Sequence, residues 1–324
     1  MDQFYRGRRL RRSVGLRNLF RETAPLRKEE LIMPYFVIEG QSTTPIASMP
    51  GQFQYSLDEL EKRVSTMYDL GLKNILLFGI PEQKDELGTA AYDQDGIVQL
   101  AVRRLKKRCP DLVVITDICL CEYTSHGHCG VLDGDGHVVN DATLPLLAKI
   151  AQTHAQAGAD MVAPSDMMDG RIQWIRAALD EQGFYNLPIL SYAVKYASSY
   201  YGPFRDAAKS APAHGDRKSY QMDAANAREA KMEALADIAE GADALIVKPG
   251  GPYSDILWQV KQACSVPVIS YQVSGEYSMI RAAGLNGWIN EQSVMYESLL
   301  GLKRAGACAV ITYFTEYLLE QKLL

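Results

Sequence analysis

Three cysteines lie close together in the sequence. Cys119, Cys121 and Cys129 fall within eleven residues, directly after an apolar segment. Thiolates bind zinc well and select against hard cations. A closed structural zinc site would need a fourth ligand, for which His126 and His128 are candidates, whereas three thiolates with an open fourth position would form a catalytic site. The alternative is three reduced cysteines without a metal.

Two lysines each end an apolar segment. Lys195 follows residues 189–194, and Lys248 follows residues 244–247. In neighbouring strands of a parallel sheet they would lie about 5 Å apart at one edge, and repulsion between their ammonium groups would lower the pKa of one of them. A neutral lysine amine attacks ketones to form a Schiff base. A lone lysine at a strand end is usually solvated, but two beside a cysteine cluster indicate amine catalysis.

A long segment rich in glycine, proline and basic residues follows the first of these lysines. Residues 198–221 exceed the length of a minimal connection between a strand and a helix, and such loops are commonly functional lids. Arg205, Arg217 and Lys218 within it are suited to bind a carboxylate. The alternative is an ordinary exposed loop.

Eight short apolar runs rich in β-branched residues predict the strands that must position these groups. They span residues 32–38, 74–80, 112–118, 161–165, 188–194, 244–249, 267–273 and 309–315. Stretches with helical periodicity lie between most of them, and a glycine precedes several of the strands, at positions 71, 158, 241 and 306. No Gly-x-Gly-x-x-Gly follows the first run, so we predict an α/β fold of the (β/α)₈ TIM-barrel type rather than an open doubly wound sheet.

The barrel predicts that chemistry gathers at the carboxyl ends of its strands. Polar and reactive side chains do follow the predicted strands, namely Asp117, Cys119 and Cys121 after the third, Lys195 after the fifth, Lys248 after the sixth, Ser274 after the seventh and Tyr313 at the eighth. Most of the uncommon chemistry is therefore expected on one rim.

Composition and charge bound the remaining possibilities. The 324 residues have a net charge of −5, but residues 1–28 hold nine Lys/Arg against Asp2 and Glu22, which leaves +7 on this segment and −12 on the rest. We predict an N-terminal arm (1–28) that lies on an acidic neighbouring subunit, followed by a catalytic barrel (29–324); nucleic-acid binding or a transit peptide are the alternatives. Six cysteines and no run of 18 apolar residues predict a cytoplasmic protein without membrane or nucleic-acid partners.

Several longer motifs resemble those of one enzyme family, the porphobilinogen synthases or 5-aminolaevulinate dehydratases, over nearly the whole chain. They are residues 49–51 (Met-Pro-Gly), 117–130 (the cysteine segment), 163–165 (Ala-Pro-Ser), 201–205 (Tyr-Gly-Pro-Phe-Arg), 216–221 (Asp-Arg-Lys-Ser-Tyr-Gln), 247–249 (Val-Lys-Pro) and 271–277 (Tyr-Gln-Val-Ser-Gly-Glu-Tyr). The resemblance implies condensation of two 5-aminolaevulinate molecules to porphobilinogen, with loss of two waters, in tetrapyrrole (haem) biosynthesis.

The same resemblance assigns roles within the site. It implies that Lys248 forms a Schiff base with the substrate supplying the propionyl side chain, and Lys195 with the substrate supplying the acetyl side chain. It implies that Cys119, Cys121 and Cys129 bind the active-site zinc of the zinc-type members. The residues implied to bind substrate are Arg205 and Arg217 for one carboxylate, Ser274 and Tyr313 for the other, and Gln221.

The resemblance also implies assembly and regulation. Family members are usually homo-octamers whose N-terminal arm embraces a neighbouring barrel, and many bind an allosteric magnesium through a glutamate that matches Glu233. Two other functions fit part of the sequence. A class I aldolase would need one Schiff-base lysine and no thiolate-bound metal, and a zinc- or thiol-sensing protein would need the cysteines but not the lysines.

Overall fold

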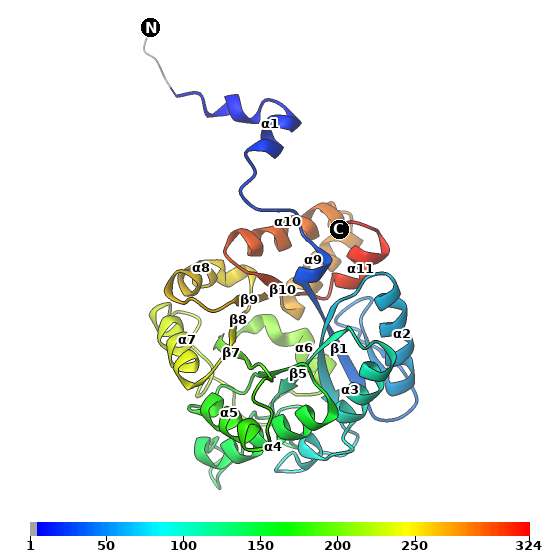
Figure 1. Cartoon of the computed structure of the whole chain (residues 1–324), viewed down its shortest axis with the longest axis vertical. Coiled ribbons are helices and arrows are strands. Elements are labelled where there is room, and N and C mark those ends of the chain that lie inside the picture. The colour runs from blue at the N-terminus through cyan, green and yellow to red at the C-terminus, as the bar shows by residue number, and fades with distance from the viewer. Residues whose placement is uncertain (1–4) are drawn as a thin grey trace.

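Eight parallel strands pair side by side around a barrel in this computed structural model, which describes residues 5–324 (Figure 1). They are β1 (Leu31–Ile38), β4 (Asn74–Ile80), β5 (Val113–Ile118), β6 (Met161–Pro164), β7 (Leu190–Lys195), β8 (Ala244–Lys248), β9 (Val268–Tyr271) and β10 (Ala309–Ile311). The paired order runs β6-β5-β4-β1-β10-β9-β8-β7. A parallel bridge between Val162 and Ile189 joins the two ends of this order and closes the ring. The predicted (β/α)₈ barrel is confirmed.

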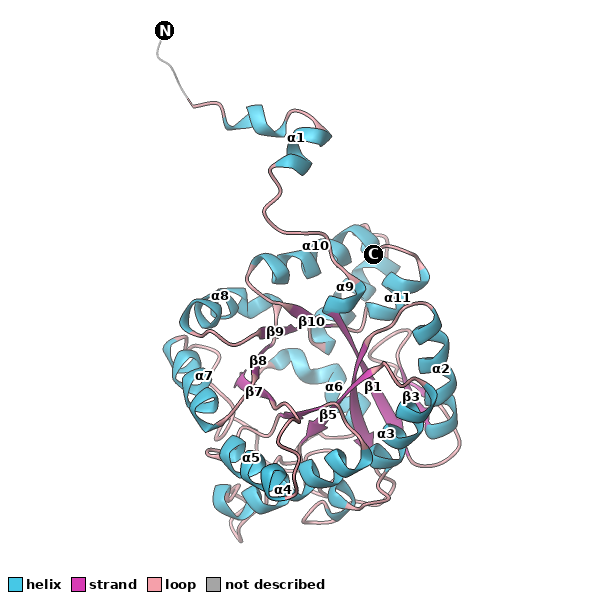
Figure 2. Cartoon of the chain, viewed as in Figure 1, coloured by secondary structure: helices cyan, strands magenta, loops and turns pink. Residues whose placement is uncertain are grey.

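Most of the helices surround the strands on the outside, whereas α6 (Gly202–Ala208) lies across the centre of the ring (Figure 2). The α-helices of the barrel are α2 (Leu57–Asp69), α3 (Ile97–Arg108), α4 (Asn140–Ala157), α5 (Arg171–Glu181), α6 (Gly202–Ala208), α7 (Arg228–Glu240), α8 (Ser254–Ala263), α9 (Ser274–Leu285), α10 (Glu291–Arg304) and α11 (Thr315–Glu320). Short 3₁₀ turns lie at η2 (Lys28–Glu30), η3 (Thr89–Tyr92), η4 (Ser199–Tyr201) and η5 (Gly251–Tyr253). None of the helices within residues 5–324 is both long enough and apolar enough to cross a membrane.

The local sequence explains where the helices lie and end. In α2 the buried side chains are Leu60, Val64 and Met67, three or four residues apart, so a single stripe faces the strands. The four glycines at positions 71, 158, 241 and 306 all have φ between 99° and 115°. This left-handed conformation suits glycine, which turns the chain from each helix into the next strand.

Several features differ from the predicted pattern. The eighth strand, predicted over residues 309–315, ends at Ile311, and α11 begins at Thr315. A short antiparallel pair, β2 (Thr44–Pro45) and β3 (Phe53–Ser56), was not predicted, and β3 extends the sheet beside β1. The seventh strand ends at Tyr271, because Val273 already caps α9.

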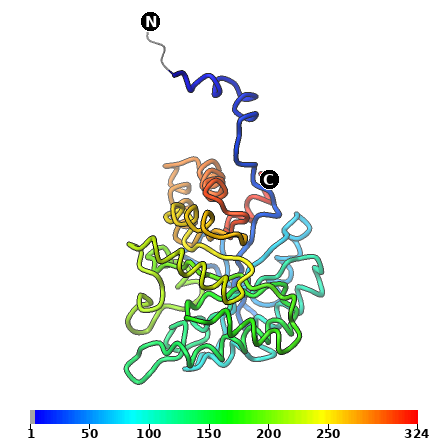
Figure 3. The backbone as a smooth tube through the Cα atoms, turned by 60° about the vertical axis from the view of Figure 1, so that its left-hand side comes forward, coloured from blue at the N-terminus to red at the C-terminus, as the bar shows by residue number. Residues whose placement is uncertain are grey.

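The N-terminal arm projects away from the barrel (Figures 1 and 3). It contains η1 (Gly7–Arg11) and α1 (Val14–Leu19), neither of which has a buried residue. Apolar side chains on it stand open to solvent, with Leu19 73% and Phe20 54% exposed. Residues 1–4 of the predicted arm lie outside the described residues. The arm therefore offers basic and apolar surface that its own barrel does not cover.

Candidate active site

The two lysines face each other across neighbouring strands. Lys195 is the last residue of β7 and Lys248 the last of β8, and their Cα atoms are register partners. The register of β7 shifts between Ser191 and Val194, because a bulge places one extra residue on this strand. Without the bulge, the residue opposite Lys248 would be Val194 rather than Lys195. Both lysines are only 4% exposed.

Their surroundings differ in polarity. The Nζ atom of Lys248 lies among four aromatic rings, with centroids at 4.4 Å for Tyr271, 4.9 Å for Phe204, 5.1 Å for Tyr192 and 5.2 Å for Tyr201. In contrast, Nζ of Lys195 donates a hydrogen bond to the carbonyl oxygen of Ser165. Two chemically identical amines thus occupy an aromatic and a polar environment.

Burial and charge separate the pKa values of the two amines. Burial, and then the neighbouring Lys195 ammonium, lower the pKa of Lys248 from 10.5 to about 7, against the opposing charge of Asp117. Burial also lowers the pKa of Lys195, but the cysteine cluster, with Cys129 contributing most, raises it more, so its pKa lies above the ordinary value. Lys248 is therefore the amine that is neutral at physiological pH.

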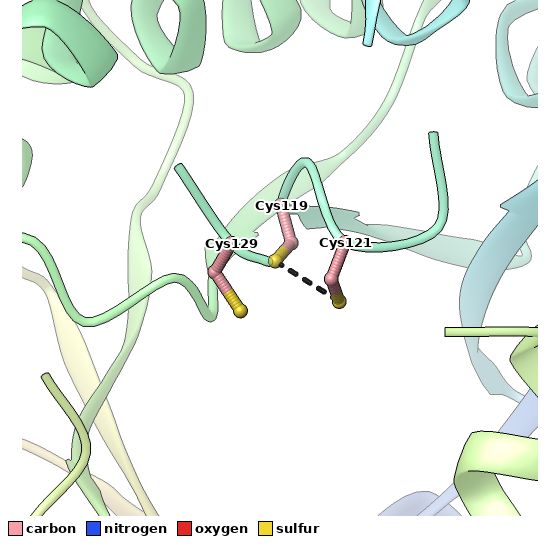
Figure 4. A group of neighbouring side chains, drawn as sticks. All are labelled: Cys119, Cys121 and Cys129. Atoms are coloured by element: carbon pink, nitrogen blue, oxygen red, sulfur yellow. Dashed lines mark hydrogen bonds between the residues drawn. The ribbon is translucent and has the colours of Figure 1, made fainter. Parts of the chain in front are cut away.

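The three predicted cysteine ligands converge in the structure. Cys119 and Cys121 follow β5, and the chain returns at Cys129, so that all three side chains point in one direction (Figure 4). Their sulfur atoms lie within 4.8 Å of one another, with 3.4 Å between those of Cys119 and Cys121. Zinc–sulfur bonds of about 2.3 Å in a tetrahedron place sulfur atoms about 3.8 Å apart. The three cysteines are buried and free of disulfides, so this donor set fits zinc.

The thiols share their protons unequally. Hydrogen bonds from Cys119 and Cys121 hold the pKa of Cys129 well below its usual value. Burial, followed by the hydrogen bonds to the other two cysteines, raises the pKa of Cys119 well above its usual value. The protein thus stabilises one thiolate by itself, and a bound cation would favour loss of the remaining protons.

The two histidines of this loop do not face the sulfur atoms as ligands. His128 bonds through Nε2 to the carbonyl oxygen of His214, at 2.9 Å, and through Nδ1 to the hydroxyl of Tyr220, at 3.1 Å. His126 bonds through Nε2 to the carbonyl oxygen of Glu86, at 3.2 Å. Both therefore hold the cysteine loop against its neighbours, which leaves three sulfur donors rather than a closed set of four.

The segment predicted as a lid covers the lysines. Residues 198–221 form η4, α6 and a loop, and Arg205 and Arg217 from this segment line the same cavity as Lys195 and Lys248. Arg217 donates to the carbonyl oxygens of Gly127, at 2.9 Å, and Ser210, at 2.5 Å. The Nε atoms of both arginines are buried without a hydrogen-bond partner. Two donors are thus left to bind a substrate anion. Lys218, in contrast, is exposed.

The other predicted substrate residues lie around the cavity rather than on its wall. Ser274 accepts a hydrogen bond from the backbone N–H of Phe204 at 2.9 Å, and Tyr313 pairs its hydroxyl with that of Tyr271 at 3.0 Å. Gln221 is buried, with neither amide atom hydrogen-bonded, and lines an adjacent crevice of about 410 Å³.

Glu233, the predicted magnesium ligand, lines the same crevice on α7. Burial and the neighbouring Asp237 carboxylate raise the pKa of Glu233. Within residues 5–324 of one chain, no group of three His, Cys, Asp or Glu ligand atoms within 4.8 Å includes Glu233. Magnesium usually keeps several waters and takes only one or two carboxylates from a protein, so Glu233 stays a predicted ligand.

Comparisons with known proteins identify the family of this chain. Residues 4–321 match the sequence model of the delta-aminolevulinic acid dehydratases. The chain belongs to the delta-aminolevulinic acid dehydratase family. It is 54% identical to the enzyme of this name from Halalkalibacterium halodurans, over 97% of this chain and 95% of that protein, and 54% identical to the one from Staphylococcus aureus strain Mu50, over 97% of both.

A solved structure of the same family has the same fold. The delta-aminolevulinic acid dehydratase (porphobilinogen synthase) of Toxoplasma gondii ME49, determined in complex with the reaction product porphobilinogen, superimposes with a TM-score of 0.96. The two chains are 44% identical, and the match covers 99% of this chain and 92% of that one. The predicted family, the barrel and the classification as a dehydratase, a hydro-lyase of tetrapyrrole biosynthesis, are confirmed for this chain.

Several residues of the cavity lie within the family-like motifs, but no role was predicted for them from the sequence. Glu122 is 2% exposed, lines the cavity and accepts a hydrogen bond from Cys121 at 3.2 Å. Ser165 places its carbonyl at Lys195 and donates its hydroxyl to Asp117 at 3.0 Å. The aromatic residues around Lys248 come from separate segments, the strands β7 and β9 and the lid, so their ring could be recognised only in three dimensions.

Proposed function

We propose that this dehydratase joins two 5-aminolaevulinate molecules through Schiff bases on Lys248 and Lys195, beside a zinc ion held by three cysteines. The observation that carries the proposal is the register of the two lysines at one end of the barrel, with the pKa of Lys248 lowered to about 7. A condensation of two aminoketones needs two carbonyl groups held side by side, and paired amines can hold both.

Lys248 is proposed to react first with a ketone. Its neutral amine attacks the carbonyl carbon, a C–N bond forms, and the carbonyl oxygen leaves as water to give an imine, which takes up one proton to become an iminium. The iminium withdraws electrons and makes the adjacent carbon more acidic, which assists the later formation of a carbon–carbon bond. The aromatic rings around Nζ exclude water from this atom.

Lys195 is proposed to anchor the second substrate. Because the cysteine thiolates raise its pKa, its amine must give up a proton before it attacks. The carbonyl oxygen of Ser165 accepts a hydrogen bond from Nζ and orients it toward the cavity that Lys248 also lines. The second Schiff base would form within the same enclosed space.

The arginines are proposed to hold a substrate carboxylate. A buried guanidinium Nε without a partner is costly, and an anion would satisfy Arg205 and Arg217 together. Ser274 and Tyr313 are proposed to hold the other carboxylate, and this requires Ser274 to exchange its present bond to Phe204 for the substrate. Gln221, with both amide atoms free and buried, is proposed to support the same lid.

Substrate entry is proposed to require movement of the lid. The free volume of this cavity is only about 10 Å³, which is far too small for two substrates. Residues 198–221 cover the cavity. Lys84 donates a hydrogen bond to the carbonyl oxygen of Lys209 in this segment, at 2.6 Å, and holds it in place. The described conformation is thus a closed one.

The zinc is proposed to sit at Cys119, Cys121 and Cys129, whose converging sulfur atoms fit it. When bound, it supplies a Lewis acid with an open coordination position. The magnesium is proposed to bind at Glu233, with several waters among its other ligands. A homo-octamer held by the basic arm and a cytoplasmic location complete the proposal.

Reductive trapping tests the proposed function. Incubation with 5-aminolaevulinate and borohydride should attach the substrate to Lys248 and Lys195, located by peptide mass spectrometry. Lys248→Ala should abolish turnover, and Lys195→Ala should lose turnover but keep the adduct at Lys248. Lys218→Ala is the matched control, because Lys218 is an exposed lid lysine. A single adduct without metal dependence would indicate an aldolase, and metal-linked stability without any adduct would indicate a sensor; either result refutes the proposal.

A further inference from the structure

We infer that Glu276 is a positioning residue for the reaction: its carboxylate ties the turn that follows Lys248 to the N-terminus of α9, and so fixes the place from which the Lys248 amine attacks. Glu276 lies in the first turn of α9, is 7% exposed and does not line the lysine cavity. The inference deepens the proposed function and rests on the proposed role of Lys248.

Three backbone N–H groups converge on this one carboxylate. Oε1 of Glu276 accepts from Gly251 at 2.8 Å, and Oε2 accepts from Val273 at 2.8 Å and from Gly250 at 3.4 Å. Val273 is the residue that caps α9, whereas Gly250 and Gly251 follow Lys248 by two and three residues. Glu276 therefore joins the segment that follows β8 to the segment that follows β9.

The turn after Lys248 is packed too tightly to move independently of these bonds. A Cβ atom on Gly250 would lie 2.7 Å from Oγ of Ser270 and 3.0 Å from the carbonyl oxygen of Tyr271. A Cβ atom on Gly251 would lie 2.6 Å from Oε1 of Glu276 itself. Glycines at both positions let the backbone approach the carboxylate and the neighbouring strand closely.

The same helix start also meets the lid. A Cβ atom on Gly275 would lie 2.5 Å from the carbonyl oxygen of Tyr200, and Ser274 bonds to the N–H of Phe204. The ring of Phe204 lies 4.9 Å from Nζ of Lys248. Displacement of the α9 terminus would thus shift both the backbone of Lys248 and part of the aromatic enclosure of its amine.

Removal of the carboxylate should slow chemistry more than binding. A misplacement of a reacting group by about 1 Å can cost on the order of 100-fold in rate. In Glu276→Gln the side-chain amide group would face one of the three backbone N–H groups, and two donors cannot bond to each other. We expect this variant to lower kcat about 10- to 100-fold with a smaller change in KM. The rate of trapping at Lys248 should fall by the same factor. Glu276→Asp keeps the carboxyl group and should recover part of the loss.

The experiment measures kcat, KM and the rate of borohydride trapping at Lys248 per folded molecule, with the folded fraction taken from circular dichroism. The variants are Glu276→Gln, Glu276→Asp and Gly251→Ala, whose methyl group would push on the carboxylate. Glu297→Gln is the control, because Glu297 is an exposed residue of α10 that lines the same outer groove as Glu276. It should behave as wild type.

Non-additive effects would identify a shared cause. Gly251→Ala combined with Glu276→Gln should be no slower than the slower single variant. A wild-type trapping rate per folded molecule in Glu276→Gln would overturn the inference, whatever the stability of that variant. If Glu276→Gln does not fold, a wild-type rate in Gly251→Ala would overturn it instead. Absence of trapping at Lys248 in the wild-type chain would refute the proposed function and the inference with it, so the two failures are distinguishable.

Discussion

The depressed pKa of Lys248 makes a quantitative prediction about both reactivity and stability. The shift from 10.5 to about 7 means that about 90% of this amine is neutral at pH 8, whereas an ordinary lysine would be about 0.3% neutral. The rate of reductive trapping at Lys248 should therefore rise tenfold per pH unit below about pH 7 and level off above it. The assay is trapping with 5-aminolaevulinate and cyanoborohydride at a series of pH values.

The same shift costs folding free energy. The unfolded chain keeps a proton on Lys248 up to about pH 10.5, and the folded chain loses it near pH 7, so unfolding takes up a proton between these values. The free energy of unfolding therefore rises with pH between about pH 7 and 10.5. At pH 7 and below, the burial of the charged Lys248 amine lowers it by the full amount. A shift of this size corresponds to at most about 5 kcal/mol.

Replacement of the amine by an apolar chain tests this cost. We expect Lys248→Met to abolish turnover yet to raise the free energy of unfolding at pH 7 by a few kcal/mol, with the gain shrinking toward pH 10. Urea unfolding at fixed protein concentration measures it, and Lys218→Met at an exposed lysine is the control. A trapping midpoint near pH 10, or a Lys248→Met variant equally destabilised at pH 7 and pH 10, would refute the reasoning.

Three further predictions concern the metal, the arm and acid stability. Cys129→Ser should lose stoichiometric zinc and most turnover without unfolding, whereas Cys264→Ser, at a half-buried cysteine outside the cluster, should keep both zinc and turnover. Zinc affinity should fall as pH drops, and lead should displace zinc. Metal content measured beside turnover checks all three expectations, and full activity after exhaustive chelation would exclude a catalytic metal. Deletion of residues 1–25 should give smaller oligomers by light scattering, and an unchanged size would show that the arm does not hold the assembly. His154 is buried with neither ring nitrogen hydrogen-bonded, and burial lowers its pKa to about 3. Between about pH 6.5 and 3 only the unfolded chain protonates it, so the free energy of unfolding should fall by up to about 1.4 kcal/mol for each pH unit of acidification. In urea titrations at acid pH His154→Leu should show a smaller fall, and an unchanged pH slope would contradict this assignment.

The regular part of the barrel could be predicted because its signals are local. Each strand is a short apolar run, and glycines such as Gly158 and Gly241 end the preceding helices in the left-handed conformation that was expected of them. The β2–β3 pair escaped prediction because a two-residue strand, Thr44–Pro45, is too short for any periodicity. Its pairing depends on contacts with β1 that no local pattern encodes.

The reactive side chains could also be predicted, since the carboxyl ends of barrel strands are few and the cysteines and lysines there are uncommon. Their relative placement could not. The bulge in β7 that brings Lys195 opposite Lys248 has no glycine or proline at Ser191–Val194 to announce it. It follows from how β7 packs between its neighbours, so a sequence reading puts both lysines on one rim but does not put them in register.

The difference between the two lysines is the part of the site that only the packed structure determines. Both amines end apolar strands, and the sequence alone suggests that repulsion lowers the pKa of one without saying which. The aromatic rings contributed by Tyr192, Tyr201 and Phe204 surround Lys248, while the thiolates and the Ser165 carbonyl face Lys195. A proton shared between the pair therefore rests on Lys195, and the amine with the lowered pKa is that of Lys248. An asymmetric condensation needs such unequal partners, because the two identical substrates must take different roles.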